Sequence, residues 1–281
     1  MGIVSGRGML AAAREGGYAV PAFNVFDLEM TQAVLQAAEA ERAPIVVQVS
    51  PRTIAYAGLA AIAAIVRTLA EGVAAPVALH LDHGPDLETC RRALGEGFTS
   101  VMFDGAALPW AENVTRTREV VALAHEHGAG AEAELGEIGH ASAGDPGASR
   151  TDPAEAAQFV RETGIDALAV AIGTVHGMAT TGATIDLPLV EALRRTVGAP
   201  LVMHGSSGVD DASLVRAIAA GVAKVNLSTA LQVAFMDALR ASAILPGHET
   251  DARSVLGDAR SAVEAAVRRR IRLVGAAGRM G

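Results

Sequence analysis

Short apolar segments alternate with longer amphipathic segments along the whole chain, and this alternation limits the possible folds more than any other feature. Eight segments rich in Val, Ile, Leu and Ala resemble buried strands: 19–24, 44–50, 76–82, 100–105, 129–135, 167–173, 200–205 and 223–228. Each precedes a segment with helical periodicity: 28–42, 54–72, 86–96, 110–127, 153–164, 188–197, 210–220 and 229–242. Strands that alternate with helices pair in parallel, and eight such units predict an α/β fold, a single (β/α)8 barrel of the TIM type.

The rest of the sequence fits one barrel domain over residues 1–281. Segments 5–16 and 257–274 predict an extra N-terminal helix and a C-terminal helical extension. Hydrophobic residues make up 51% of the chain and aromatic residues only 3%, so the interior must be packed from small aliphatic side chains.

Charge and cysteine content exclude several classes of partner. The net charge of −8 and the pI near 5.5 argue against nucleic acid or an anionic membrane surface. A single cysteine, Cys90, cannot form an intramolecular disulfide, and residues 1–20 lack the apolar core of a signal peptide. No apolar run reaches the ~18 to 20 residues of a membrane span. We therefore expect a soluble cytoplasmic protein.

Polar side chains stand at the carboxyl ends of the predicted strands, where enzymes with this fold place their active sites. Seven of the eight strands end in such a group, and the remaining strand leads into His176 in G-T-V-H-G. The residues are Asn24, Ser50, Asp82, His83, Asp104, Glu134, His204, Asn226, Ser228 and Thr229. Because the strand ends meet at one mouth, we expect these side chains to form one site.

Three histidines, His83, His176 and His204, follow strands three, six and seven. Three neutral imidazoles with an open fourth position are the ligand set of a catalytic zinc ion. For each histidine alone the alternative is a hydrogen-bonded loop residue, but the matching positions favour a metal site. His80 shares a strand face with Asp82, and we expect it to be a packed, hydrogen-bonded neighbour of the site rather than a ligand.

Glycines and hydroxyl side chains at neighbouring strand ends predict a phosphate site. They are Gly177, Gly205, Gly208, Ser206, Ser207, Ser228 and Thr229. Exposed backbone N–H groups beside the start of a helix commonly bind phosphate in such barrels. Each glycine alone could equally be an ordinary turn residue.

A Lewis acid, a carboxylate and a phosphate site together predict reversible carbon–carbon cleavage of a phosphorylated ketose, whose departing carbanion must be held as an enediolate. A Schiff base is the other chemical route. That route would depend on Lys224, the only lysine in the chain. A zinc hydrolase and a non-catalytic barrel that binds sugar phosphate are two further alternatives.

The motifs that carry these residues resemble the class II, zinc-dependent ketose-bisphosphate aldolases, the tagatose-bisphosphate branch more than the fructose-bisphosphate branch. The resemblance runs nearly end to end, through Y-A-V-P-A-F-N (18–24), A-L-H-L-D-H (78–83), S-V-M-F-D-G (100–105), A-E-L-G (133–136), A-I-G-T-V-H-G (171–177), H-G-S-S-G (204–208) and K-V-N-L-S-T (224–229). It implies cleavage of tagatose or fructose 1,6-bisphosphate to dihydroxyacetone phosphate and glyceraldehyde 3-phosphate. Another phosphorylated sugar or sugar acid is the alternative substrate.

The resemblance also implies a role for each residue. His83, His176 and His204 would hold Zn²⁺, Asp82 would move the proton of the C4 hydroxyl, and Asn226 would steady the enediolate. Asp104 and Glu134 match carboxylates of an alternate metal position. The substrate and its 1-phosphate would be bound by Asn24, Ser50, Gly177, Gly205, Ser207, Asn226, Ser228 and Thr229. Further family features are a monovalent cation such as Na⁺ or K⁺, a homodimer or homotetramer, and in some relatives a non-catalytic partner subunit.

Two segments depart from the family pattern. The long irregular stretch 136–150, which we expect to be a mobile flap, carries Ser142 where relatives have a glutamate implicated in proton exchange. Asp145, His140 or Glu137 would have to replace that glutamate, or the proton step differs. The eighth strand ends in N-L-S-T-A-L, which resembles the motif of the tagatose-type enzymes more than that of the fructose-type enzymes.

Overall fold

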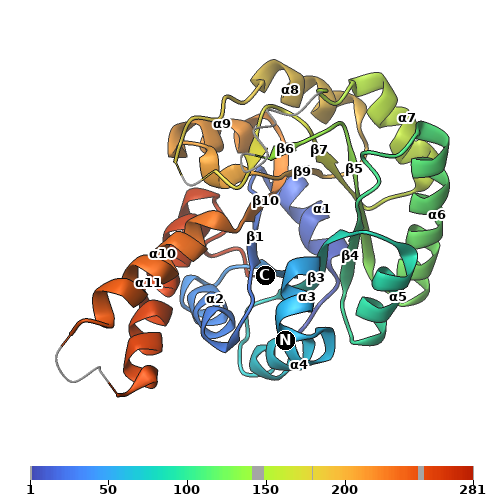
Figure 1. Ribbon diagram of the computed structural model, residues 1–281. Helices are drawn as coiled ribbons and strands as arrows, with labels where there is room; N and C mark the ends of the chain where they lie inside the picture. Colours follow the sequence, from blue (N-terminus) through green and yellow to red (C-terminus); the bar gives the residue numbers. More distant parts are fainter. Residues whose placement is uncertain (1, 141–148, 179, 246–249, 281) are drawn as a thin grey trace.

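Eight parallel strands close into a barrel in the computed structural model, which describes residues 2–140, 149–178, 180–245 and 250–280 (Figure 1). The strands are β1 (Val20–Asn24), β2 (Ile45–Val49), β3 (Val77–Gly84), β4 (Ser100–Phe103), β5 (Gly130–Leu135), β7 (Ala167–Val170), β9 (Leu201–Met203) and β10 (Val222–Leu227). Their order round the barrel is β1, β10, β9, β7, β5, β4, β3, β2, and pairing of β1 with β10 closes it. The predicted (β/α)8 barrel is confirmed.

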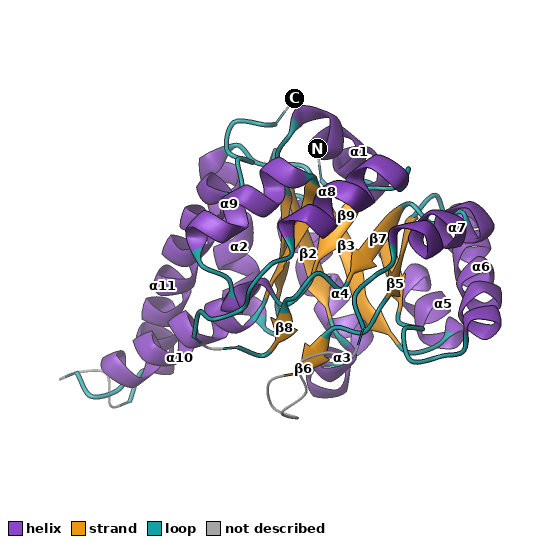
Figure 2. Ribbon diagram, turned by 90° about the horizontal axis from the view of Figure 1, so that it is seen from above, coloured by secondary structure: helices purple, strands orange, loops and turns teal. Residues whose placement is uncertain are grey.

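Helices cover the outside of the barrel (Figures 1 and 2). They are α1 (Gly6–Gly16), α2 (Leu28–Glu41), α3 (Pro51–Ala57), α4 (Leu59–Ala70), α5 (Leu87–Gly95), α6 (Trp110–Glu126), α7 (Pro153–Thr163), α8 (Leu187–Thr196), α9 (Asp211–Ala220), α10 (Thr229–Ser242) and α11 (Ala252–Leu273). Six begin behind an aspartate whose carboxylate accepts a first-turn N–H, which fixes where these helices start. Those caps are Asp27, Asp86, Asp152, Asp186, Asp210 and Asp251.

One end of the barrel is covered and the other is open. Helix α1 packs against β1, β3, β5 and β10 at the amino ends of the strands, near both chain termini (Figure 2). The core is almost entirely aliphatic, as the composition requires, and strand residues are buried on both faces. The carboxyl ends of the strands form the open mouth, and the polar residues gather there.

The prediction of one helix over 54–72 is wrong. Helices α3 and α4 occupy this segment, at 96° to each other, and the chain turns between them at Gly58. Gly58 has a φ of 81°, a conformation that favours glycine. Helix α3 also begins earlier than predicted, because Ser50 caps it and Pro51 stands at its first position.

The flap segment contributes a short strand that was not predicted. Strand β6 (Gly139–His140) pairs in parallel with β8 (Val175–His176), outside the barrel sheet. His140 thereby stands in register with His176. The predicted mobile flap, with Ser142 and Asp145, otherwise falls largely in 141–148, outside the described residues.

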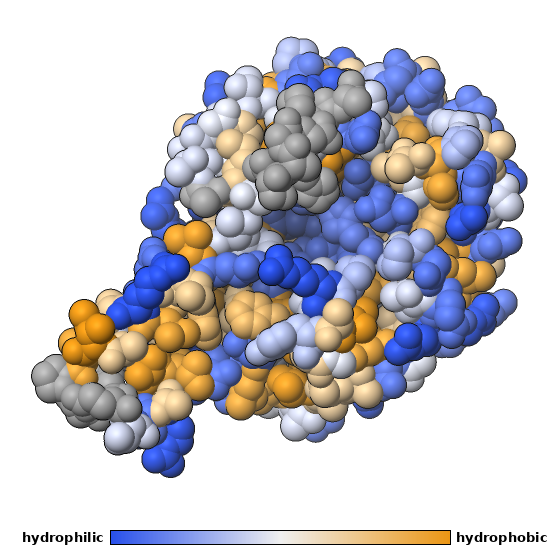
Figure 3. Space-filling view, in the orientation of Figure 1, coloured by the Kyte–Doolittle hydropathy of each residue, from blue (hydrophilic) through white to orange (hydrophobic). Residues whose placement is uncertain are grey.

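Helices α10 and α11 form an arm that projects from the side of the barrel (Figure 1). Figure 3 shows hydrophobic (orange) surface gathered over the arm. The exposed large apolar side chains of the arm are Val233, Met236, Ile244 and Leu245. Within the described chain no single helix has the length and apolar character of a membrane span; only the bent pair α3 and α4 together passes that test, by length and composition alone.

Candidate active site

A local irregularity in β3 brings Asp82 and His83 to the same cavity. The pairing of β3 with β4 shifts register between Leu81 and Gly84, and His83 has a φ of 53°, in the left-handed region. Such an irregularity changes the face to which successive side chains point, so both residues line the barrel mouth although they are adjacent in sequence. Strained backbone of this kind clusters at functional sites.

The imidazoles of His83, His176 and His204 converge. Their ring centroids lie 5.0 Å (His83 to His176), 4.8 Å (His83 to His204) and 5.5 Å (His176 to His204) apart. One ring nitrogen of each lies within 4.8 Å of the others. Strand β3, strand β8 and the residue after β9 each supply one ring, so the barrel unites three ligands that are far apart in sequence.

Hydrogen bonds on the far side of two rings fix their orientation. Nδ1 of His83 lies 2.7 Å from Oδ2 of Asp104, which leaves Nε2 facing the other imidazoles. Nε2 of His204 lies 3.0 Å from Oε1 of Glu132, which leaves Nδ1 facing them. The other oxygen of Glu132 accepts from Nζ of Lys224 at 2.7 Å, and this pair is buried beneath the histidines. Carboxylates that hold histidines in this way are common behind metal ligands.

The surroundings shift the pKa values of the two rings in opposite directions. Burial and the nearby His83 hold the pKa of His204 well below its usual value, so His204 is neutral. Burial also lowers the pKa of His83, but the charge of Asp82 and the hydrogen bond with Asp104 outweigh it and raise that pKa to about 9.

Asp82 is held by two asparagines from the strands that close the barrel. Its Oδ2 accepts from Nδ2 of Asn24 at 2.8 Å, and its Oδ1 accepts from Nδ2 of Asn226 at 3.3 Å. Gln48, fully buried on β2, donates to Oδ1 of Asn24 at 2.8 Å and so orients the Asn24 amide. Burial raises the pKa of Asp82, but the charge of His83, other neighbouring groups and the hydrogen bond from Asn24 together lower it by more, so the group is a carboxylate at neutral pH.

Asp104 and Glu134 lie behind His83 and form a second cluster with it, with one ligand atom of each within 4.8 Å of the others. Burial and the charge of Asp104 raise the pKa of Glu134 to about 8. His80 lies deeper, where its Nδ1 hydrogen-bonds Ser100 at 2.8 Å.

Two glycine turns directly follow two of the histidines and line the same cavity. Gly205 and Gly177 have φ values of 64° and 76°. A Cβ at Gly205 would lie 2.7 Å from backbone atoms of Val175, so glycine alone lets this turn approach β8 so closely. Ser207, in the short turn Ser206–Gly208, accepts through Oγ from the N–H of Ala230 in the first turn of α10, at 3.2 Å.

The cavity at the mouth has a volume of about 420 Å³, within the range of small-molecule sites, and Figure 3 shows it as a hydrophilic hollow. Every predicted site residue lines it except Asp104 and Glu134: Asn24, Ser50, Asp82, His83, His176, Gly177, His204, Gly205, Ser207, Asn226, Ser228 and Thr229.

Four polar residues of the site were not predicted. Arg52 and Gln232 also line the cavity, while Gln48 and Glu132 hold its residues from below. The signal for Gln48 and Glu132 was present, because each is a polar residue inside a predicted buried strand. Arg52 carried no such signal, since an arginine at the start of an amphipathic helix is usually a surface residue.

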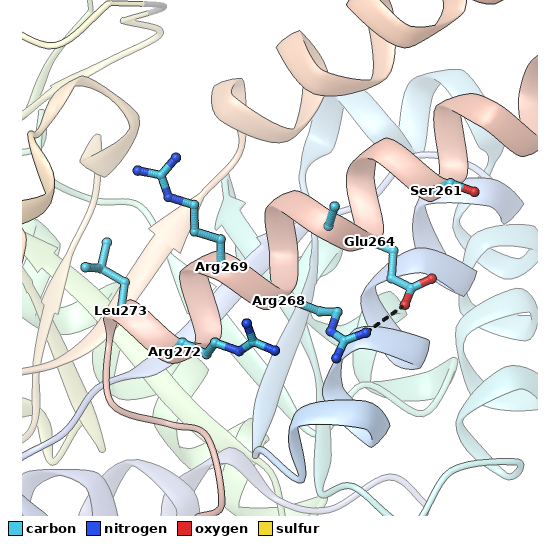
Figure 4. A pocket seen from close by; sticks show the side chains of 7 residues that line it. Ser261, Glu264, Arg268, Arg269, Arg272 and Leu273 are labelled. Atoms are coloured by element: carbon cyan, nitrogen blue, oxygen red, sulfur yellow. Dashed lines mark ion pairs between the residues drawn. The ribbon is translucent and has the colours of Figure 1, made fainter.

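A larger hollow of about 670 Å³ runs along the outside of α11 (Figure 4). Its arginines are already engaged: Arg268 and Arg272 pair with Glu41, and Arg269 pairs with Asp211. Among its lining residues there is no histidine, cysteine or aspartate. The reacting groups therefore lie at the barrel mouth.

The fold and the site define a parallel barrel with a candidate three-histidine metal site at its mouth. Residues 4–279 match the family model described as "Fructose-bisphosphate aldolase class-II". The chain therefore belongs to the class II fructose-bisphosphate aldolase family and is an aldehyde-lyase, as predicted, not a hydrolase or a non-catalytic barrel.

Individual relatives agree with this assignment. A "Probable fructose-bisphosphate aldolase" of Bacillus subtilis (strain 168) is 42% identical over 272 residues, which cover 95% of both chains. The YdjI aldolase of Escherichia coli K12 has a similar crystal structure, with a TM-score of 0.89, 32% identity and coverage of 99% of this chain and 100% of that one. A putative fructose-1,6-bisphosphate aldolase from Coccidioides immitis has a TM-score of 0.88 and 30% identity, covering 98% and 97%.

Proposed function

We propose that this aldolase reversibly cleaves a ketose 1,6-bisphosphate, tagatose or fructose 1,6-bisphosphate, to dihydroxyacetone phosphate and glyceraldehyde 3-phosphate. The observation that carries the proposal is the convergence of three imidazoles beside one ionised carboxylate, in a cavity that is also lined by glycine turns and hydroxyl groups. The alternative, another phosphorylated sugar or sugar acid, uses the same chemistry.

His83, His176 and His204 would hold the catalytic Zn²⁺ of this zinc-dependent family. The donor set fits zinc, because His204 is neutral and the far nitrogens of His83 and His204 are already bound to carboxylates. A bound zinc ion would supply a Lewis acid that polarises the carbonyl of the ketose. His83 must lose its proton for the ion to bind, so zinc affinity rises with pH in the neutral range.

Asp82 would take the proton from the C4 hydroxyl during cleavage and return it during condensation. Its carboxylate is ionised, and Asn24 and Asn226 hold both oxygens in place. Oδ1 of Asn226 is buried and makes no hydrogen bond within the described structure, so this acceptor is left for a substrate hydroxyl. Asn226 would therefore steady the reacting part of the ketose.

The 1-phosphate would bind at Gly177, Gly205, Ser207, Ser228 and Thr229. These groups offer neutral N–H and hydroxyl donors beside the start of α10, a setting that suits phosphate. Asp104 and Glu134 would serve as an alternate metal position with His83. A monovalent cation such as Na⁺ or K⁺ near the phosphate is a further part of this proposal.

The protein would act as a cytoplasmic homodimer or homotetramer, with or without a non-catalytic partner subunit. Support comes from the apolar side chains on the α10–α11 arm, among which Ile244 is 83% exposed. The buried, unpaired thiol of Cys90 agrees with a reducing compartment.

The test is a coupled assay of zinc-loaded protein with fructose and tagatose 1,6-bisphosphate side by side, each with and without a chelator. We expect release of dihydroxyacetone phosphate that stops with chelator and returns with zinc. The ratio of the two cleavage rates then distinguishes a tagatose-bisphosphate aldolase from a fructose-bisphosphate aldolase. If zinc-bound protein cleaves neither bisphosphate, the proposed substrates are wrong.

A further inference from the structure

The turn 205–208, between β9 and α9, is fixed by a segment that does not line the reaction cavity. This return segment, residues 182–186, lies between β8 and α8. The N–H groups of Gly182 and Ala183 both donate to the carbonyl oxygen of Gly208, at 2.9 and 3.0 Å. The end of the turn is therefore bound to the return segment. The proposed reaction gives this segment no role.

The return segment is itself anchored beyond the end of β7. The N–H of Asp186 donates to the carbonyl oxygen of Ile172 at 2.8 Å. Gly173 has a φ of 113°, and a Cβ at this position would clash with the carbonyl oxygen of Thr184. Glycine alone allows so close an approach in this conformation. The barrel wall thus fixes the segment, and the segment fixes the turn.

Met178 packs between the turn and the return segment, with its side chain half-buried. A Cβ at Gly208 would lie 2.7 Å from both Cβ and Sδ of Met178, and a Cβ at Gly182 would lie 3.5 Å from its Cε. Packing this close leaves no room for a methyl group at Gly208. The φ of Gly208 is not positive. The contact with Met178, and not the backbone conformation, therefore requires glycine here.

The other side of the turn is bound to β10 and α10. The hydroxyl of Ser206 donates to the carbonyl oxygen of Asn226, and Oγ of Ser207 accepts from the N–H of Ala230 at 3.2 Å. The turn therefore lies between two fixed elements. Met178 is the side chain that packs against it on the side of the return segment.

The position of Met178 in the sequence connects the two glycine turns. Met178 directly follows Gly177, whose turn would bind the 1-phosphate together with Gly205 and Ser207. Contact of Met178 with Gly208 therefore sets the distance between the two turns. A phosphate that is bound by groups of both turns requires a constant distance between them, because hydrogen bonds weaken when donor and acceptor are misaligned.

We propose that Met178 is a positioning residue for the 1-phosphate of the substrate. It acts through the turn 205–208, since Met178 itself does not line the reaction cavity. The inference rests on the proposed function, because it explains how the groups that bind this phosphate keep their spacing. Displacing the turn should weaken binding of the phosphorylated ketone and leave binding of the aldehyde unchanged.

The test is condensation of dihydroxyacetone phosphate with glyceraldehyde 3-phosphate by zinc-loaded protein, with a separate KM for each substrate. The variants are Gly208→Ala, Met178→Gly and the two together. Gly198→Ala is the matched control: it precedes β9, its φ is not positive either, and a Cβ there would meet nothing within 4 Å. Zinc content and calorimetric titration with dihydroxyacetone phosphate alone are measured for each protein.

Gly208→Ala should raise the KM for dihydroxyacetone phosphate by about 10-fold, because the added methyl group displaces the turn and misaligns hydrogen bonds to a charged group. Calorimetric titration should show the same loss of affinity. The KM for glyceraldehyde 3-phosphate should stay within about twofold of wild type, and kcat should change less than the KM for dihydroxyacetone phosphate. The zinc content should remain one ion per chain.

Met178→Gly alone should raise the KM for dihydroxyacetone phosphate less, by about threefold, since packing is lost but no atoms clash. The double variant should match Met178→Gly and not Gly208→Ala. The reason is that the three atoms nearest to the new methyl group all belong to the side chain that is removed. Gly198→Ala should match wild type throughout.

Four results would overturn the inference. They are an unchanged KM for dihydroxyacetone phosphate in Gly208→Ala, an equal rise in both KM values, a double variant as impaired as Gly208→Ala, and loss of zinc from Gly208→Ala. Wild type that holds zinc but neither binds nor condenses dihydroxyacetone phosphate would instead overturn the proposed function, and the inference with it. Because the calorimetric titration needs no aldehyde, it tests Met178 even where the natural aldehyde is a different one.

Discussion

Lys224 donates through Nζ to Oε2 of Glu132 across 2.7 Å, and both side chains are buried inside the barrel. The same glutamate holds the ring of His204 through its other oxygen. The only lysine of the chain is therefore bound to the carboxylate that orients His204, and is not a free amine in the cavity. A Schiff-base reaction has no nucleophile here.

Borohydride added with substrate should leave the activity intact, because no imine forms.

Lys224→Met should lower the free energy of unfolding by about 3 to 5 kcal/mol, since it leaves the charge of Glu132 buried and unpaired. Adding Glu132→Gln should restore most of that stability, because the amide oxygen still accepts from His204. Urea unfolding of the single and double variants checks this; an equally unstable double variant would contradict it.

Asp82→Asn should lower kcat by about 10² to 10⁴-fold, because the group that moves the C4 proton is lost while its shape is kept. The zinc content, measured by metal analysis, should remain one ion per chain. His204→Ala is the comparison variant and should lose the ion itself. An Asp82→Asn protein without zinc would mean that Asp82 organises the metal site instead.

Gly205→Ala should damage the metal site. The new Cβ would meet the backbone of Val175 at 2.7 Å, and β8, which carries His176, would have to move. Gly164→Ala is the matched control, since its φ of 73° is also in the left-handed region but its Cβ would meet nothing closer than 3.9 Å. Both variants should lose about 1 to 2 kcal/mol from backbone strain, but only Gly205→Ala should weaken zinc binding in a metal titration.

Glu41→Gln should destabilise the protein in a pH-dependent way. Hydrogen bonds from Arg272 and Arg268 lower the pKa of Glu41 below its ordinary value of 4.5. A lowered pKa stabilises the fold above pH 4.5, and this contribution is lost as the pH falls through the lowered value. We expect a loss of about 1 kcal/mol at pH 7, modest because Arg272 is largely exposed.

The difference from wild type should shrink below pH 4.5 in thermal unfolding. Glu191→Gln, which breaks an exposed pair with Arg195, should have little effect at any pH. A constant difference between Glu41→Gln and wild type down to pH 2 would contradict the role of the ionised carboxylate.

The barrel could be predicted because strand burial and helix caps are local signals. All eight barrel strands overlap the predicted segments, since each is a compact apolar run between turn residues. The break at Gly58 was missed because a glycine within a helical pattern is usually tolerated. The positive φ of His83 and the bond of Glu132 with Lys224 depend on contacts between distant strands, which no local pattern encodes.

Closure of the barrel by β1 and β10 has a consequence for how activity appears during folding. Asn24 and Asn226, the two residues that hold Asp82, belong to these two strands, at opposite ends of the sequence. No fragment that lacks either terminal strand can assemble the site. Regain of catalysis after denaturation should therefore coincide with the last and most distant strand pairing, later than the recovery of helix content.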